Sequence, residues 1–121
     1  MRVFITRVEL HGGSEDDYQT LHEAMEQRAF VRQILGQDGI WYHLPTATYY
    51  HIGNESPEEV RKQACDAAAI DLGKRPDEYC VLVTSSIGNY WVNLIPVRPQ
   101  PVFTARRTLA DALIASNKWL S

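Results

Sequence analysis

Residues 1–54 carry one continuous pattern that narrows the fold more than any other part of the chain. Apolar and polar residues alternate with a period of two over 3–10, which is typical of a half-buried strand. A stretch with a period of 3.6 follows over 15–30, and Asp38-Gly39 then marks a hairpin turn between two further strands. A second helix and a second pair of strands come after this block, so the sequence predicts an α+β fold.

The first strand has two unlike faces. The residues predicted to face the core are Phe4, Thr6, Val8 and Leu10. The alternate residues become polar along the strand and are Val3, Ile5, Arg7 and Glu9. Because only the first set stays largely apolar, we expect it to lie under the helices.

Both predicted helices begin at recognisable caps. Ser14 is an N-cap candidate followed by three acidic residues, which favour the positive end of a helix dipole. Ser56 precedes a proline at the first helical position, and Glu59 completes a capping box. Gly73 is a natural C-terminal cap for the second helix.

Four further segments are predicted to be strands. Residues 31–35 and 40–52 flank the Asp38-Gly39 turn, and Pro45 interrupts the second of them. The apolar run 79–84 is typical of a strand buried at the centre of a sheet, and 90–97 is expected to return as a fifth strand. Thr108 opens a short predicted C-terminal helix.

The predicted order β-α-β-β-α-β-β indicates a ferredoxin-like split βαβ sandwich, an antiparallel sheet with two helices on one face. We expect this domain to span 1–97, followed by a proline-rich linker and short helix over 98–121. The residues expected to line the other face of the sheet are Val3, Ile5, Tyr49 or Tyr50, and Trp91. If the last helix does not cover this face, its apolar patch is suited to a homodimer.

Composition restricts the function classes. The chain has 121 residues and a net charge of −3, so its overall field does not favour nucleic acid, and any RNA contact requires a local basic patch. Cys65 and Cys80 have no metal-ligand spacing and are expected to be small buried apolar residues. Neither a signal peptide nor a membrane-spanning stretch is visible, which predicts a soluble cytoplasmic protein with no cofactor and no membrane partner.

Several segments resemble a known family. RVEL, YQTLHEAMEQRAF, DGIWYHLPTATYYHIGN, EEVRKQACDAAA and EYCVLVT are similar to small bacterial proteins of the GhoS type, over roughly residues 1–97. This resemblance implies a ferredoxin-like endoribonuclease that serves as the antitoxin of a type V toxin–antitoxin system by cutting the toxin's mRNA. The related CRISPR-associated nucleases place a metal-binding acidic residue at the end of the first strand. Glu9 is the nearest here and no Asp is present, so we expect no metal site and a metal-independent reaction.

Histidine and arginine are the side chains that suit metal-independent cleavage of RNA. His11 lies where the first strand meets a Gly-Gly loop, and together with Arg28 it is the predicted catalytic pair. His22 is expected on a helix surface, and His43 and His51 in strands near tyrosines. The predicted RNA-binding set is Arg2, Arg7, Arg32 and Tyr49. Tyr50, Trp41 and Trp91 are further aromatic candidates for stacking on bases.

Two functions stay open at this point. The first is an RNA-directed antitoxin-type protein that cleaves single-stranded mRNA. The alternative is a non-catalytic, dimeric protein-interaction module, for example a phage or plasmid inhibitor of a host protein. The acidic balance of the chain and the absence of a compact catalytic motif favour the alternative, whereas the family resemblance favours the first.

Overall fold

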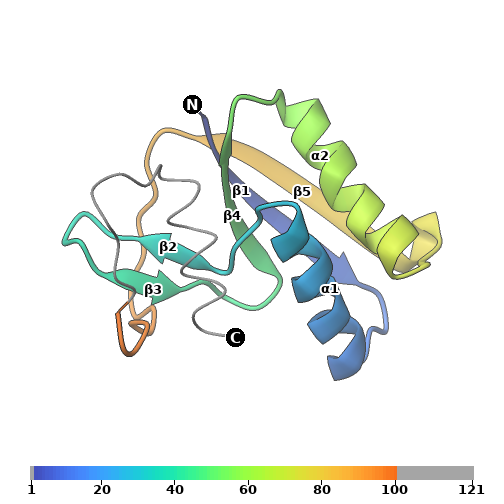
Figure 1. Cartoon of the computed structure of the whole chain (residues 1–121), viewed down its shortest axis with the longest axis horizontal. Coiled ribbons are helices and arrows are strands. Elements are labelled where there is room, and N and C mark those ends of the chain that lie inside the picture. The colour runs from blue at the N-terminus through green and yellow to red at the C-terminus, as the bar shows by residue number, and fades with distance from the viewer. Residues whose placement is uncertain (1, 101–121) are drawn as a thin grey trace.

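The computed structural model describes residues 2–100, which form an α+β fold (Figure 1). In chain order the main elements are β1 (Arg2–Leu10), α1 (Glu15–Gln27), β2 (Gln33–Leu35), β3 (Trp41–His43), β4 (Thr48–Gly53), α2 (Pro57–Asp66) and β5 (Tyr79–Ser86). A π-helix, η1 (Ala67–Asp71), continues α2, and a 3₁₀ turn, η2 (Pro76–Glu78), precedes β5. The predicted C-terminal helix lies outside the described residues.

Both predicted helix starts are confirmed in atomic detail. The Ser14 hydroxyl accepts a hydrogen bond from the backbone N–H of Asp17, whose carboxylate accepts one in return from the Ser14 N–H. Ser56 and Glu59 make the same reciprocal pair at the start of α2. Each helix therefore begins at a complete capping box, which satisfies two backbone donors that would otherwise be unpaired.

The main sheet has three antiparallel strands in the order β4-β1-β5. Thr6 lies opposite Tyr49 of β4 and Val83 of β5, so β1 is the central strand. The prediction that 79–84 is a central strand is wrong, because β5 lies at the edge and exposes alternate residues. Its inner residues Val81 and Val83 pack on the helices, while its outer face is uncovered. Cys80, predicted to be buried, lies exposed on that outer face.

Both helices cover one face of this sheet and enclose the first core (Figure 1). The four core-facing residues predicted on β1 are all buried, which confirms the period-two reading. Leu21 and Met25 of α1 and Val60 and Ala64 of α2 pack onto them. The small side chains of α2 allow its backbone to approach the sheet closely.

The other face of the sheet carries a second core. The β2–β3 hairpin and residues 91–97 pack against this face, so it is not the open apolar patch expected for dimerisation. The buried members of the second core are Val31, Ile34, Trp41, Tyr50, Ile52 and Val97. Val3, Ile5 and Trp91, which were predicted to line this face, pack against them as partly buried side chains.

Residues 90–97 do not form the predicted fifth strand. Among the described residues this segment makes one isolated bridge, between Pro96 and Tyr42 of β3. Asn93 has a positive φ of 62°, and Pro96 lacks a backbone donor, so neither fits a regular ladder. A second isolated bridge joins Val31 to Tyr50 and attaches the hairpin to β4.

Candidate functional site

A cavity of about 480 Å³ opens between α1 and the β2–β3 hairpin. Its lining residues are His22, Arg32, Gln33, His43, Leu44, Pro45 and Thr46. None of these described lining residues is acidic, so the fixed charge of the cavity is the positive charge of Arg32. Two imidazoles and a guanidinium without a carboxylate suit an anionic ligand such as a phosphate group.

His22 is held at this cavity by Tyr49. Its Nδ1 atom lies 2.7 Å from the Tyr49 hydroxyl, and Tyr49 is fully buried on the inner face of β4. Burial lowers the pKa of His22 to about 4, and the nearby positive charge of Arg32 adds to this effect. Burial also raises the pKa of the Tyr49 hydroxyl, which therefore keeps its proton. The His22 ring is thus neutral at pH 7, as a proton acceptor must be.

Arg32 is the cation of the cavity. It lies in the segment between α1 and β2, and it makes no ion pair within residues 2–100. Its main chain is fixed, because the Arg32 carbonyl accepts a hydrogen bond from the N–H of Leu44 at 2.8 Å. The hairpin therefore holds the backbone of Arg32 at the cavity, and the guanidinium keeps its donors for a ligand.

Gln33, the first residue of β2, adds an unusual polar group to the cavity wall. Its side chain is only 2% exposed, and its Oε1 atom accepts no hydrogen bond from any described residue. A buried acceptor without a donor costs about 1–3 kcal/mol, so such atoms are rare in folded proteins. Because this oxygen is buried, we assign it no contact with a ligand in the cavity.

The structure does not bring the predicted catalytic pair together. His11 lies at the end of β1, where its Nδ1 atom is 3.0 Å from the carbonyl of Asp77. Arg28 follows the last turn of α1 and pairs with Asp71 of η1. The 13 residues of α1 lie between them, and a helix of that length spans about 20 Å. One phosphate cannot contact both side chains.

The predicted RNA-binding residues also separate. Arg2 and Arg7 are exposed on β1 and do not line the cavity, whereas Arg32 does. Tyr49 lies beside the cavity, but its buried ring presents no face on which a base can stack. Its contribution is instead the hydroxyl that holds His22.

His22 and His43 are the cavity residues that sequence reasoning missed. A signal for His22 was present, because it follows Tyr18 by four residues on the same helix. The His22 ring lies against the rings of Tyr18 and Tyr49. His43 reaches the cavity because the hairpin pairs it directly with Gln33. His51, the remaining histidine, is buried, with its Nε2 atom 2.7 Å from Glu55 Oε2, and its ring stacks on Phe30.

No family model, curated protein or solved structure matches the chain. The assignment of a function therefore depends on the side chains themselves. Within the described residues there is no group of three metal-ligating side chains and no helix that is long and apolar enough to cross a membrane.

Proposed function

We propose that this protein is an RNA-directed, antitoxin-type endoribonuclease that cleaves single-stranded mRNA in the cytoplasm without a metal ion. The observation that carries this proposal is that His22, His43 and Arg32 line one cavity that has no acidic side chain among its described residues. The resemblance to GhoS-type antitoxins supports the same assignment. We further propose His22, His43 and Arg32 as the catalytic set, in place of His11 and Arg28.

The reaction is a transfer within the RNA strand. The ribose 2′-oxygen attacks the adjacent phosphorus, and the bond from phosphorus to the 5′-oxygen of the next nucleotide breaks. In the proposed tautomer His22 Nδ1–H donates to the Tyr49 hydroxyl oxygen, which orients the ring. The unprotonated Nε2 atom of the neutral ring then takes the 2′-hydroxyl proton. His43 donates a proton to the leaving 5′-oxygen, and Arg32 stabilises the charge on the phosphorane. The products are a 2′,3′-cyclic phosphate and a 5′-hydroxyl.

A ferredoxin-like architecture is part of the proposal. The order β4-β1-β5 corresponds to the third, first and fourth strands of a split βαβ sandwich, with both helices on one face. The Val31–Tyr50 bridge lies beside β4, where the second strand of that fold would pair. The β2–β3 hairpin would then be a short second strand that has folded over the sheet.

The test uses a fluorescent single-stranded RNA, incubated with the full chain in the presence of EDTA. We expect cleavage to products that end in a cyclic phosphate, and no cleavage of the same oligonucleotide with 2′-O-methyl groups. His22→Ala or His43→Ala should lower the rate by roughly 10²–10⁴-fold, the range for loss of a general acid or base. His11→Ala serves as the matched histidine control outside the cavity. Absence of cleavage by the wild-type protein, or an unchanged rate in both cavity variants, contradicts the proposal.

A second candidate, a non-catalytic and dimeric protein-interaction module, is favoured by one observation. The segment after β5 exposes four large apolar side chains, which are Ile87, Tyr90, Val92 and Ile95. Exposed apolar clusters of this kind often mark protein-binding surfaces. Light scattering separates the candidates when combined with the RNA assay. A protein that does not cleave RNA and whose solution mass exceeds the 13.8 kDa of one chain supports the dimeric interaction module. A protein that does not cleave RNA and is monomeric rules out a dimeric module.

A further inference from the structure

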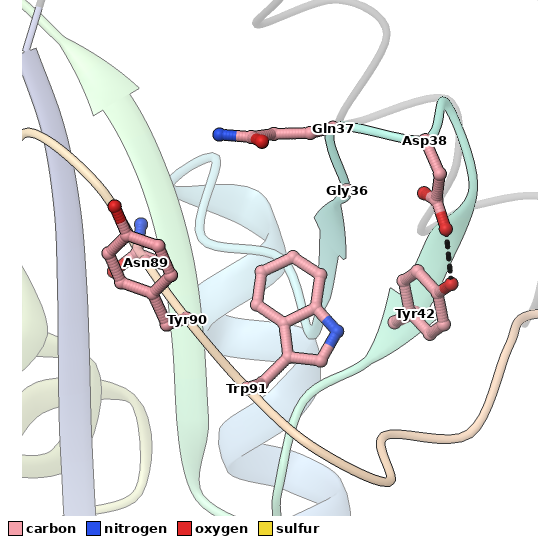
Figure 2. Close-up of a pocket in the computed structure, with 7 residues that line it drawn as sticks. All are labelled: Gly36, Gln37, Asp38, Tyr42, Asn89, Tyr90 and Trp91. Carbon is pink, nitrogen blue, oxygen red and sulfur yellow. Dashed lines mark hydrogen bonds between the residues drawn. The ribbon is translucent and has the colours of Figure 1, made fainter.

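A second, aromatic pocket lies apart from the cavity. It has a volume of about 240 Å³ and lies between the β2–β3 turn and the segment that follows β5. Figure 2 shows Trp91 at its centre, with Tyr90 on one side and Tyr42 and Asp38 on the other. The lining residues are Gly36, Gln37, Asp38, Tyr42, Asn89, Tyr90 and Trp91. The volume is below the roughly 300–1,000 Å³ of typical ligand pockets and suits one planar ring system.

The aromatic rings of this pocket are held in place from one side. Trp91 packs edge-on against Tyr42, with ring centroids 5.5 Å apart and an interplanar angle of 60°. The Tyr42 hydroxyl donates a hydrogen bond of 2.6 Å to Asp38 Oδ2, as Figure 2 shows. Asp38 Oδ1 in turn accepts from the N–H of Ile40. Trp91 is therefore fixed by a chain of contacts that leaves it only partly buried.

Tyr90 shows that the pocket is open to a partner. Its side chain is 93% exposed, although a tyrosine ring is usually at least partly covered. Trp41 and Tyr50, which were also predicted to stack on bases, are buried in the second core and have no free face. Of the aromatic residues at the pocket, Tyr90 is exposed and Trp91 is partly exposed, so both rings can contact a ligand.

The polar rim of the pocket selects among planar ligands. Asp38 is ionised, since its hydrogen bond from Tyr42 lowers the pKa of the carboxyl. Each carboxylate oxygen accepts one hydrogen bond within the protein and has a further lone pair available. A ring with an exocyclic amino group can donate to that lone pair. Among the nucleobases, adenine, cytosine and guanine carry such a group and uracil does not.

We propose that this aromatic pocket holds one unpaired nucleobase of an RNA strand, stacked on Trp91 and Tyr90, with its amino group toward Asp38. This inference rests on the proposed function and adds a specificity subsite to it. Tyr42 and His43 are consecutive on β3, so their side chains lie on opposite faces of the hairpin. The subsite is therefore separate from the cleavage cavity, and a base paired in a duplex cannot enter it.

The test measures binding of short fluorescent oligoadenylate and oligouridylate to the full chain by anisotropy, with 2′-O-methyl RNA to prevent cleavage. We expect oligoadenylate to bind more tightly. Trp91→Ala or Tyr90→Ala should weaken binding by roughly 5- to 100-fold, the range for loss of one stacked base. Tyr90→Ala is the more telling variant, because so exposed a side chain can be removed without disturbing the core. Ile70→Ala, which removes an exposed apolar side chain of η1, is the matched control.

The outcomes separate this inference from the proposed function. If wild-type protein cleaves RNA and both aromatic variants bind it as before, the subsite is refuted and the endoribonuclease stands. If Tyr90→Ala weakens binding but wild-type protein does not cleave, the subsite stands and the cleavage proposal falls. Asp38→Asn should remove the preference for adenine over uracil, and an unchanged preference refutes the role of Asp38. A wild-type protein that binds neither oligonucleotide overturns the subsite, and one that also fails to cleave unmodified RNA overturns both proposals.

Discussion

At the scale of single residues, His22 makes the protein sensitive to acid. Its pKa is about 4 in the folded protein, against 6.5 for an ordinary histidine, so the unfolded chain binds the proton more readily. The free energy of unfolding therefore falls as the pH drops from about 6.5 through about 4, and the contribution of His22 is fully present only above that range.

His22→Gln should reduce this dependence, because glutamine does not titrate. We expect the free energy of unfolding in urea to fall less steeply over this pH range than in wild-type protein. Gln19→Ala, a change on the exposed surface of the same helix that removes no titrating group, should keep the wild-type slope. Equal slopes for His22→Gln and wild type would show that the half-buried His22 does not have a lowered pKa in the folded protein.

Ala29 is a second residue whose conformation affects the stability of the fold. It has a φ of 64° in the motif that ends α1, where its N–H donates to Glu26 and that of Phe30 donates to Met25. Glycine adopts this conformation freely, whereas other L-residues pay about 1–2 kcal/mol.

Ala29→Gly should therefore raise the free energy of unfolding by about 1 kcal/mol in a thermal or urea titration. Glu23→Gly provides the comparison, because it places glycine in the exposed middle of α1 and should lower stability by a similar amount. Destabilisation by both changes would show that position 29 has no strain to relieve.

At the scale of elements, the sequence correctly predicted the features that depend on residues close together in the chain. The caps at Ser14 and Ser56 act within three residues, so both helix starts were correct. The predicted central position of 79–84 in the sheet was wrong, because an apolar run does not reveal whether one or two neighbouring strands pair with it. The cavity was missed for a related reason. His22, Arg32 and His43 meet only after the hairpin has folded against α1 and β4, which no local pattern records.

The edge position of β5 gives a further prediction. Leu82 is 63% exposed and lies directly opposite Arg7 on the outer face of the sheet. Leu82→Glu places opposite charges across the two strands and should stabilise the fold by about 0.2–1 kcal/mol relative to Leu82→Lys. The two variants are matched in size and exposure, so a difference in their urea midpoints that shrinks in high salt identifies the cross-strand pair. Equal urea midpoints for the two variants would contradict the pairing of Leu82 with Arg7.

At the scale of the whole molecule, two cores share one sheet. The first lies between the sheet and the helices, and the second lies between the sheet and the hairpin. β1 and β4 contribute side chains to both, since alternate residues point to opposite faces. Loss of either core therefore removes support from the other.

We accordingly expect residues 2–100 to unfold as one unit. Tryptophan fluorescence reports on the second core through Trp41 and Trp91, and far-ultraviolet circular dichroism reports on the helices. The two urea transitions should coincide in a Trp119→Phe background, which removes the tryptophan outside the described residues. A fluorescence transition that precedes loss of helix would instead show that the hairpin detaches independently.

The central position of β1 has a consequence for synthesis. β1 leaves the ribosome before both strands that pair with it, and the last of them joins Leu10 to Tyr79. Before β5 has been synthesised, one edge of β1 has no partner strand, and the first core lacks Val81 and Val83. Because such distant pairing also slows folding, the growing chain exposes an apolar strand for much of its translation. We therefore expect chaperones that act on nascent chains to bind this protein at β1.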